Sequence, residues 1–564
     1  MIGLVVFLLL SFLLFAPRYA FNSKTAAFFP LKEFFPKGRF RIQPFFTRFN
    51  EDVFRLNWEY ALLVVVLSML QNEIPMVYAK VILAVFYWLT LIFFLYHHSI
   101  YGIYKSYPSF KSDIALIRQG IQIGFSGYKT ALFTGFLLFL GLSGLVFWAN
   151  CYLVEMLFAA NILLFYCSVI TFIGIAYWCY KKVNPLQFTK EERFEIHHFA
   201  TIQWSLSLLL SNLFFTRKTK EDLAQIPELI AQSVVKIPND LSLKSKPNLC
   251  FIAIESYGAI LNENEVYRER YQTLLENWER KLQNENCKSA SILSETTVTG
   301  GTSWVSYSSF LKGVKIKNDF IYRFLLNHQK EHKTQSVLDI LNKLNYDTYL
   351  VAGIGGFETL SIEWEKIMSF LGTKNTIKYS DLEYKGETFN FGPSAPDQFL
   401  LNKARDLMKT KSKNNPFAFF VETINSHYNF DSPTRVLPQW TDCQTANRHE
   451  YKPLENLSEK PVENYFEAIA YQLNNLENFI KNDNSSDTIY IVFGDHQPPL
   501  ITDPKNSYKT PIHIICKETD FIKPWLAVGF EHGLKTKLAS QKKFSHADFK
   551  KIFTEIFFKT YQNC

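Results

Sequence analysis

The sequence predicts an α-helical polytopic membrane domain followed by a C-terminal α/β domain, and three observations lead to that prediction. Long apolar runs dominate the 564-residue chain up to about residue 215. Beyond that point, charged and polar residues alternate with short apolar runs, as in a soluble domain. Those short runs alternate with helical patterns, which is typical of a mostly parallel sheet with helices on both faces. We therefore expect a transmembrane domain at 1–215, a charged linker at 216–247 and an α/β domain at 248–564.

Six apolar runs predict five or six membrane spans. They cover residues 2–16, 60–70, 76–96, 130–149, 152–180 and 199–215. Three of them reach or approach the roughly 20 residues that a helix needs to cross a bilayer, and three are shorter. The weakest run is 199–215, because it contains Gln203 and Asn212, and a buried core helix is its alternative interpretation. We expect residues 1–16 to be a retained span, since a signal peptide would begin with basic residues.

Basic residues in the connecting segments predict the orientation of these spans. Lys and Arg concentrate after the first, third and fifth runs, whereas the short connections around Glu73 and Asn150 carry no excess of positive charge. Because cytoplasmic loops are enriched in Lys and Arg, both span counts place the α/β domain outside the cytoplasm. Arg217, Lys218 and Lys220 follow the last run and argue mildly against that orientation.

The formal net charge of +8 does not predict a nucleic-acid partner. Much of the positive charge lies in the predicted cytoplasmic segments. The segment 17–58 intersperses Phe with Arg and Lys, which is typical of an amphipathic loop lying on anionic lipid. The eight cysteines show no CxxC spacing, so they predict neither a zinc knuckle nor a disulfide framework.

Within the α/β domain, strands and helices alternate. Strands are expected at 249–254, 348–351, 417–421, 488–493 and 512–516, and helices at 267–282, 336–344, 399–408 and 462–480. In sheets of this type, ligands bind at the carboxyl ends of the strands. Glu255, His427 and the pair Asp495-His496 each follow a predicted strand, so we expect the functional site to be built from them.

The side chains of Glu255, Asp495 and His496 predict a divalent metal site. Carboxylate oxygen and imidazole nitrogen suit Mn²⁺ or Zn²⁺, and three protein ligands leave a position for a reacting oxygen. An acid that ends a strand is more often a solvated residue or a helix cap. The argument for a metal therefore depends on the three residues together.

Thr302 is the candidate fourth metal ligand and the candidate nucleophile. It follows Gly300-Gly301, which lets the backbone approach a ligand closely, and it precedes an apolar stretch that could begin a helix. A hydroxyl there would feel both the metal and the helix dipole. The alternative without a catalytic role is an ordinary N-cap threonine after a Gly-Gly turn, and Ser303 is the competing nucleophile.

His427 lies in the segment Asn425-Ser426-His427-Tyr428, after the strand expected at 417–421. An imidazole at that position could contact a substrate phosphate or protonate a leaving oxygen. A surface histidine without a role is the alternative.

These segments together resemble the lipoteichoic acid synthase-like branch of the alkaline phosphatase/sulfatase superfamily, over residues 248–558. The motifs that carry the resemblance occur in the order and approximate spacing of that branch. They are Ile254-Glu255-Ser256, Gly300-Gly301-Thr302-Ser303, Asn425-Ser426-His427-Tyr428-Asn429-Phe430, Asn464-Tyr465 with Tyr471, Phe493-Gly494-Asp495-His496 and Ser545-His546-Ala547-Asp548.

The resemblance implies a multi-pass enzyme of the bacterial plasma membrane with an extracytoplasmic, sulfatase-like catalytic domain. Such an enzyme transfers the phosphate headgroup of a phospholipid donor, through a phosphothreonine, to an envelope glycan or lipid acceptor. By this resemblance Glu255, Thr302, Asp495 and His496 bind one Mn²⁺ or Zn²⁺, Thr302 is the nucleophile, and His427 contacts the substrate.

One departure from the family pattern concerns the headgroup. Lipoteichoic acid synthases carry a His-x-Asp and a following Arg in the segment that corresponds to 352–364. This chain has a Gly-rich stretch there, followed by Glu358, Glu363 and Glu365. Acids would suit a cationic headgroup, so phosphoethanolamine competes with phosphoglycerol.

Two other classes of function remain as alternatives. One is a metal-dependent phosphodiesterase, phosphatase or sulfatase-like hydrolase, in which water replaces the acceptor, although the Cys-x-Pro-x-Arg motif of true sulfatases does not occur in the sequence. The other is a non-enzymatic scaffold or transporter. The sequence disfavours it, because all four candidate metal ligands are present and chemically competent.

Overall fold

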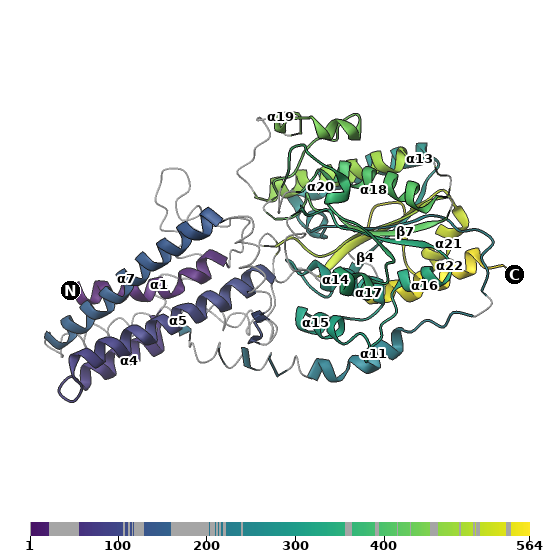
Figure 1. The fold of residues 1–564 in the computed structure, drawn as a ribbon. Coiled ribbons are helices and arrows are strands. Elements are labelled where there is room, and N and C mark those ends of the chain that lie inside the picture. Colours follow the sequence, from purple (N-terminus) through teal and green to yellow (C-terminus); the bar gives the residue numbers. More distant parts are fainter. Residues whose placement is uncertain are drawn as a thin grey trace. The chain divides into compact units, whose positions relative to one another are not determined.

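Figure 1 shows the chain in a computed structural model. The structure describes residues 2–21, 56–104, 108–110 and 129–159, isolated positions between 113 and 217, and residues 221–563 with short gaps. The gaps are 239–240, 356–363, 390–393, 414, 429, 452–460, 484, 486, 500–501, 503–507 and 537–542. The chain forms two compact units, one made of Met1–Ile103, Tyr107–Phe110 and Tyr128–Arg217, and the other mainly of Lys218–Cys564.

The first unit contains four described helices around an apolar core. They are α1 (Ile2–Phe21), α4 (Trp58–Met69), α5 (Met76–Tyr104) and α7 (Lys129–Ala159), and a short parallel pair joins β1 (Leu56–Asn57) to β2 (Ile202–Gln203). Tyr60 and Tyr87 lie buried at its centre. Two segments are long and apolar enough to cross a membrane, Met76–Ile100 and Phe133–Ala159, and the apolar helices Ile2–Ser11 and Glu59–Met69 are shorter.

The expected break between the fourth and fifth spans is wrong. Asn150, where we expected a connection, lies inside the continuous helix α7. Its amide donates to the carbonyl of Val146 at 2.8 Å and accepts from the Tyr60 hydroxyl at 3.0 Å, so the polar side chain is satisfied without leaving the helix. The turn near Glu73 is confirmed, between α4 and α5.

The predicted count of five or six spans is not confirmed among the described residues. The basic loop 22–55, most of the expected span 152–180 and most of 199–215 lie outside them. Two charged residues fall within runs that we expected to be spans, Lys80 on α5 and Glu155 on α7, and they form an ion pair with each other.

The second unit is built on an eight-stranded sheet in the order β10-β4-β9-β8-β3-β7-β5-β6. Five neighbouring strands are parallel: β8 (Ile489–Gly494), β3 (Leu249–Ile254), β7 (Phe417–Glu422), β5 (Asp347–Val351) and β6 (Asn375–Ile377). The remaining three pair antiparallel: β9 (Lys509–Cys516), β4 (Lys288–Glu295) and β10 (Glu531–His532). The prediction of a mostly parallel sheet is confirmed.

Helices cover both faces of this sheet, as Figure 1 shows. On one face lie α13 (Glu265–Asn284), α18 (Asp397–Ser412) and α20 (Pro461–Lys481). On the other lie α14 (Ser303–Lys312), α16 (Val337–Lys343), α17 (Trp364–Leu371), α21 (Thr519–Ala527) and α22 (Phe549–Tyr561). The shorter helices are α11 (Ile226–Ser233), α12 (Ile260–Glu263), α15 (Asp319–Asn327) and α19 (Arg448–Tyr451).

Side chains of β3 alternate between two apolar cores. Ile252 and Ile254 pack with the α13 and α20 side, whereas Phe251 and Ala253 pack with the α14 and α22 side. A strand buried on both faces reads as a continuous apolar run, which is why this strand was predictable. The sequence did not reveal β4, because its Ser- and Ala-rich pattern contains only one of the β-branched residues that mark a strand, Ile292.

Candidate active site

Neighbouring parallel strands bring the first two predicted ligands together. β3 pairs with β8 in a register that sets Ile254 opposite Gly494. Glu255 and Asp495 are the next residues of their strands, so both side chains emerge at the same edge of the sheet. Gly494 is required there, because a Cβ atom at that position would lie 1.9 Å from the carbonyl oxygen of Tyr257.

Glu255, Asp495 and His496, three of the four predicted metal ligands, form one buried cluster. One ligand atom from each lies within 4.8 Å of the others. His496 Nε2 is 3.3 Å from Asp495 Oδ2 and 3.6 Å from Glu255 Oε1. His496 Nδ1 lies 2.9 Å from the carbonyl oxygen of Gln497, a contact that suits an Nδ1 proton and leaves the Nε2 lone pair facing the carboxylates.

The cluster fits a divalent cation. Asp495 is fully buried, and its Oδ1 accepts hydrogen bonds from the backbone N–H groups of Ser256 and His496 at 2.7 and 2.6 Å. Its Oδ2 is buried and accepts no hydrogen bond from any residue that the structure describes. A buried carboxylate oxygen without a hydrogen-bond donor is costly, and a metal ion would satisfy it.

The two carboxylates of the cluster titrate in opposite directions. Burial and the charge of Glu255 raise the pKa of Asp495 well above its usual range. Burial also opposes the ionisation of Glu255, but the charges of His496 and His427 and the hydrogen bonds from Ser256 and Ser303 outweigh it, so the pKa of Glu255 is lowered. Such opposed shifts within one buried cluster are typical of functional sites.

The hydroxyl that reaches this cluster is that of Ser303, at the first position of α14. Ser303 Oγ donates to Glu255 Oε2 at 3.0 Å and lies 3.2 Å from His496 Nε2. Thr302 precedes it as the N-cap residue, yet its hydroxyl donates to the carbonyl oxygen of Gly301 at 2.6 Å. Thr302 therefore occupies the N-cap position, but its side chain forms no capping hydrogen bond with the described part of the helix.

The backbone before α14 explains the glycine pair. Gly300 and Gly301 have φ values of 74° and 147°, in the region that favours glycine, and Thr302 itself has a φ of 60°. A β-branched residue in the left-handed region stores local strain, and such strain is concentrated at functional sites.

His427 lies in the loop after β7, where the sequence placed it. Ser426 donates to the backbone carbonyl of Glu255 at 2.6 Å, and the buried Asp397 accepts from the backbone N–H groups of Ile424 and Asn425. These bonds hold the loop against the cluster. The half-buried His427 is close enough for its charge to lower the pKa of Glu255.

Other motif residues support the loops rather than contacting the cluster. The Tyr465 hydroxyl donates to the carbonyl of Ser256 at 2.8 Å and accepts from the N–H of Gly258 at 3.1 Å. His546 bridges Ser294, at 2.8 Å, and the carbonyl of Gly494, at 3.1 Å.

Sequence reasoning missed one carboxylate, Glu422. It ends β7, on the other side of β3 from β8, and pairs with Ala253. Burial, the charges of Glu255 and Asp495 and a hydrogen bond with Asp495 raise its pKa well above the usual range, and a hydrogen bond with Ser303 offsets only part of that rise. The signal was present, because Glu422 follows an apolar strand in the same way as Glu255 does.

Two of the three acids predicted to bear on the headgroup, Glu358 and Glu363, fall in the segment 356–363, which lies outside the described residues. Glu365 lies in the first turn of α17.

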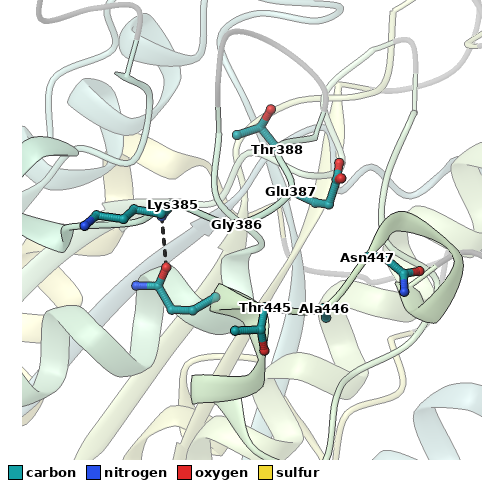
Figure 2. A pocket seen from close by; sticks show the side chains of 8 residues that line it. Lys385, Gly386, Glu387, Thr388, Thr445, Ala446 and Asn447 are labelled. Atoms are coloured by element: carbon teal, nitrogen blue, oxygen red, sulfur yellow. Dashed lines mark hydrogen bonds between the residues drawn. The ribbon is translucent and has the colours of Figure 1, made fainter.

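A separate polar hollow of about 360 Å³ is shown in Figure 2, lined by Lys385, Gly386, Glu387, Thr388, Gln444, Thr445, Ala446 and Asn447. The backbone N–H of Lys385 donates to Gln444 Oε1 at 2.9 Å across it. None of the predicted site residues lines this hollow.

A comparison with protein families identifies the fold of the second unit. The family model described as Sulfatase matches residues 247–542, which span the sheet and every residue of the cluster. The chain belongs to the sulfatase family. This membership confirms the superfamily that the motifs predicted. No curated protein matches the sequence of this family member.

Solved structures resemble the chain at low identity. The lipoteichoic acid synthase LtaP from Listeria monocytogenes is 17% identical, with 52% of this chain and 71% of that chain covered and a TM-score of 0.35. The periplasmic domain of EptC from Escherichia coli, in complex with zinc, is 12% identical, with coverages of 57% and 86% and a TM-score of 0.37. The phosphoglycerol transferase GacH of Streptococcus pyogenes is 14% identical, with coverages of 60% and 81% and a TM-score of 0.34.

Proposed function

We propose that this sulfatase-family protein is a membrane-anchored, metal-dependent transferase that moves a phosphate headgroup from a phospholipid donor to an envelope glycan or lipid acceptor. The observation that carries the proposal is the buried Glu255–Asp495–His496 cluster with a helix-terminal hydroxyl beside it. The order of the sequence motifs supports the lipoteichoic acid synthase-like branch. The apolar helices of the first unit support anchoring in a membrane. By the family resemblance, that membrane is the plasma membrane of a bacterium and the catalytic domain is extracytoplasmic.

Glu255, Asp495 and His496 would hold one divalent metal ion, Mn²⁺ or Zn²⁺, with a hydroxyl of the Thr302-Ser303 pair as the fourth ligand. When bound, the metal acts as a Lewis acid that stabilises charge on phosphoryl oxygens and favours an ionised hydroxyl. The N-terminus of α14 adds backbone N–H groups and a positive dipole end at the same place.

Residues of the site could support two successive phosphoryl-transfer steps. In the first, the side-chain hydroxyl oxygen bonds to phosphorus, its proton passes to Glu255, and the bond to diacylglycerol breaks as His427 protonates the leaving oxygen. In the second, the acceptor hydroxyl loses its proton to His427 and bonds to phosphorus. The side-chain oxygen then leaves and regains its proton from Glu255.

Two adjacent hydroxyls compete for the role of nucleophile. The family resemblance favours Thr302, and the contacts favour Ser303, which reaches Glu255 and His496. Intact-mass measurement after exposure to phospholipid, followed by peptide mapping, would locate the phosphorylated adduct. Of the two single variants, Thr302→Ala and Ser303→Ala, we expect only one to lose the phosphorylated adduct, and we expect both to retain the metal. An unmodified protein that still turns over would refute the covalent route.

The headgroup can be tested with phosphatidylethanolamine and phosphatidylglycerol labelled in the headgroup. We expect transfer from the ethanolamine lipid, on the electrostatic argument from the acidic segment after residue 352. Label released only from the glycerol lipid would exclude it. Equal release with and without an added glycan would favour a hydrolase, and no release from either lipid would favour the non-enzymatic alternative.

A further inference from the structure

Three adjacent strands each end on a carboxylate. In the sheet order β8-β3-β7, Asp495 and Glu255 directly follow their strands at the same level, whereas Glu422 is the last residue of β7 and pairs with Ala253, two residues before Glu255. The first two belong to the predicted cluster, and the third does not.

The alternation of side chains places all three acids on one face. The residue two positions before each acid, Phe493, Ala253 or Phe420, belongs to the apolar core on the α14 side of the sheet. The residue directly before Glu422 and Glu255, Val421 or Ile254, belongs to the opposite core. Because side chains alternate with a period of two, the acids project toward the end of the sheet where α14 begins.

Helix α14 extends along the same strands. Tyr307 packs against Phe420 of β7, with ring centroids 4.8 Å apart, and Ser306 donates to the backbone carbonyl of Asp495. The start of the helix therefore lies over both β7 and β8, and the hydroxyl of Ser303 faces the carboxylates at the ends of these strands.

Two buried carboxylate oxygens at this place have no hydrogen-bond donor among the described residues, Asp495 Oδ2 and Glu422 Oε1. They come from strands on either side of β3. An unsatisfied buried carboxylate is far more costly than an unsatisfied amide. The carboxylates of Asp495 and Glu422 lie within hydrogen-bonding reach of each other, so one shared cation would satisfy both.

We propose that Glu422 is a further protein ligand of the metal ion, so that the site contains three carboxylates and one imidazole. The inference rests on the proposed metal-dependent function and extends it. With Glu422 the ligand set is rich in oxygen and carries three negative charges. Carboxylate-rich sets suit Mn²⁺ and Mg²⁺, whereas Zn²⁺ prefers nitrogen and sulfur ligands. The site with Glu422 therefore favours Mn²⁺ over Zn²⁺ more strongly than a site made of Glu255, Asp495 and His496 alone.

The test compares Glu422→Gln with Glu269→Gln, a matched change on the exposed side of α13. Binding of Mn²⁺ and of Zn²⁺ to the detergent-purified chain is measured by competition with a metal-chelating dye. We expect Glu422→Gln to weaken Mn²⁺ at least tenfold and Zn²⁺ by a smaller factor, and Glu269→Gln to change neither. Unchanged Mn²⁺ affinity in Glu422→Gln would overturn the proposal, even if turnover is lost.

A second variant separates a ligand role from a structural one. Glu422→Asp keeps the carboxylate and shortens its reach by one methylene, so it should retain more Mn²⁺ affinity than Glu422→Gln. Equal losses in both variants would overturn the proposal. If the unsubstituted protein binds neither Mn²⁺ nor Zn²⁺, the proposed metal-dependent function fails as well, and the two failures are thereby distinguished.

Discussion

Phe310 connects the helix that carries the candidate nucleophiles to the strand that carries Asp495 and His496. Its ring stacks on Phe493 of β8, with centroids 3.8 Å apart and an interplanar angle of 10°, and on Phe549 of α22, at 3.9 Å and 14°. The side chain is fully buried. Replacing Phe310 with alanine removes a buried aromatic ring and both stacking contacts, which typically costs about 3–5 kcal/mol.

Thermal unfolding of the detergent-purified chain, followed by tryptophan fluorescence, measures this loss. A cost of about 4 kcal/mol corresponds to a melting temperature roughly 6 °C lower for a domain of this size. Phe558→Ala is the matched control, because Phe558 is only partly buried and its ring lies 6.4 Å from that of Phe557. If Phe310→Ala lowers the melting temperature no more than Phe558→Ala does, the stack does not stabilise the domain and the reasoning is refuted.

Three further predictions concern the strand end and the metal. Gly494→Ala should lower stability by about 1–3 kcal/mol and weaken metal binding, because the new methyl group would meet the carbonyl of Tyr257; unchanged denaturation and metal titration would contradict this. Burial lowers the pKa of His546 to about 3. Between pH 3 and about pH 6.5 the folded state therefore binds fewer protons than the unfolded state. The contribution of neutral His546 to the free energy of unfolding is fully present above pH 6.5 and is lost on acidification, by on the order of 5 kcal/mol at most. His546→Gln should make the denaturation midpoint depend less on pH between pH 7 and pH 4. An unchanged pH dependence would refute the assignment of this effect to His546. Removing the metal with a chelator should lower the melting temperature and adding Mn²⁺ should restore it, because Asp495 Oδ2 has no hydrogen-bond donor among the described residues; an unaffected melting temperature would argue against a metal at this oxygen.

Much of the site was predictable from local pattern. Strands β3 and β8 are buried on both faces, so each appears in the sequence as an unbroken apolar run that ends on a polar residue. Because sites of α/β folds lie at strand ends, Glu255, Asp495 and His496 could be selected before any contact was known. Glu422 carried the same signal, but only the order of the strands places it beside the others.

The sequence by itself determined the α/β class of the second unit and the residue types of its candidate metal cluster, because periodicity and strand ends are local properties. The tertiary structure decided the rest. Asn150 continues α7 because Tyr60, far away in the chain, satisfies its amide. Ser303 rather than Thr302 reaches Glu255 because the left-handed backbone at Thr302 sets the direction of both side chains. Contacts between distant residues determine these features, and no local pattern encodes such contacts.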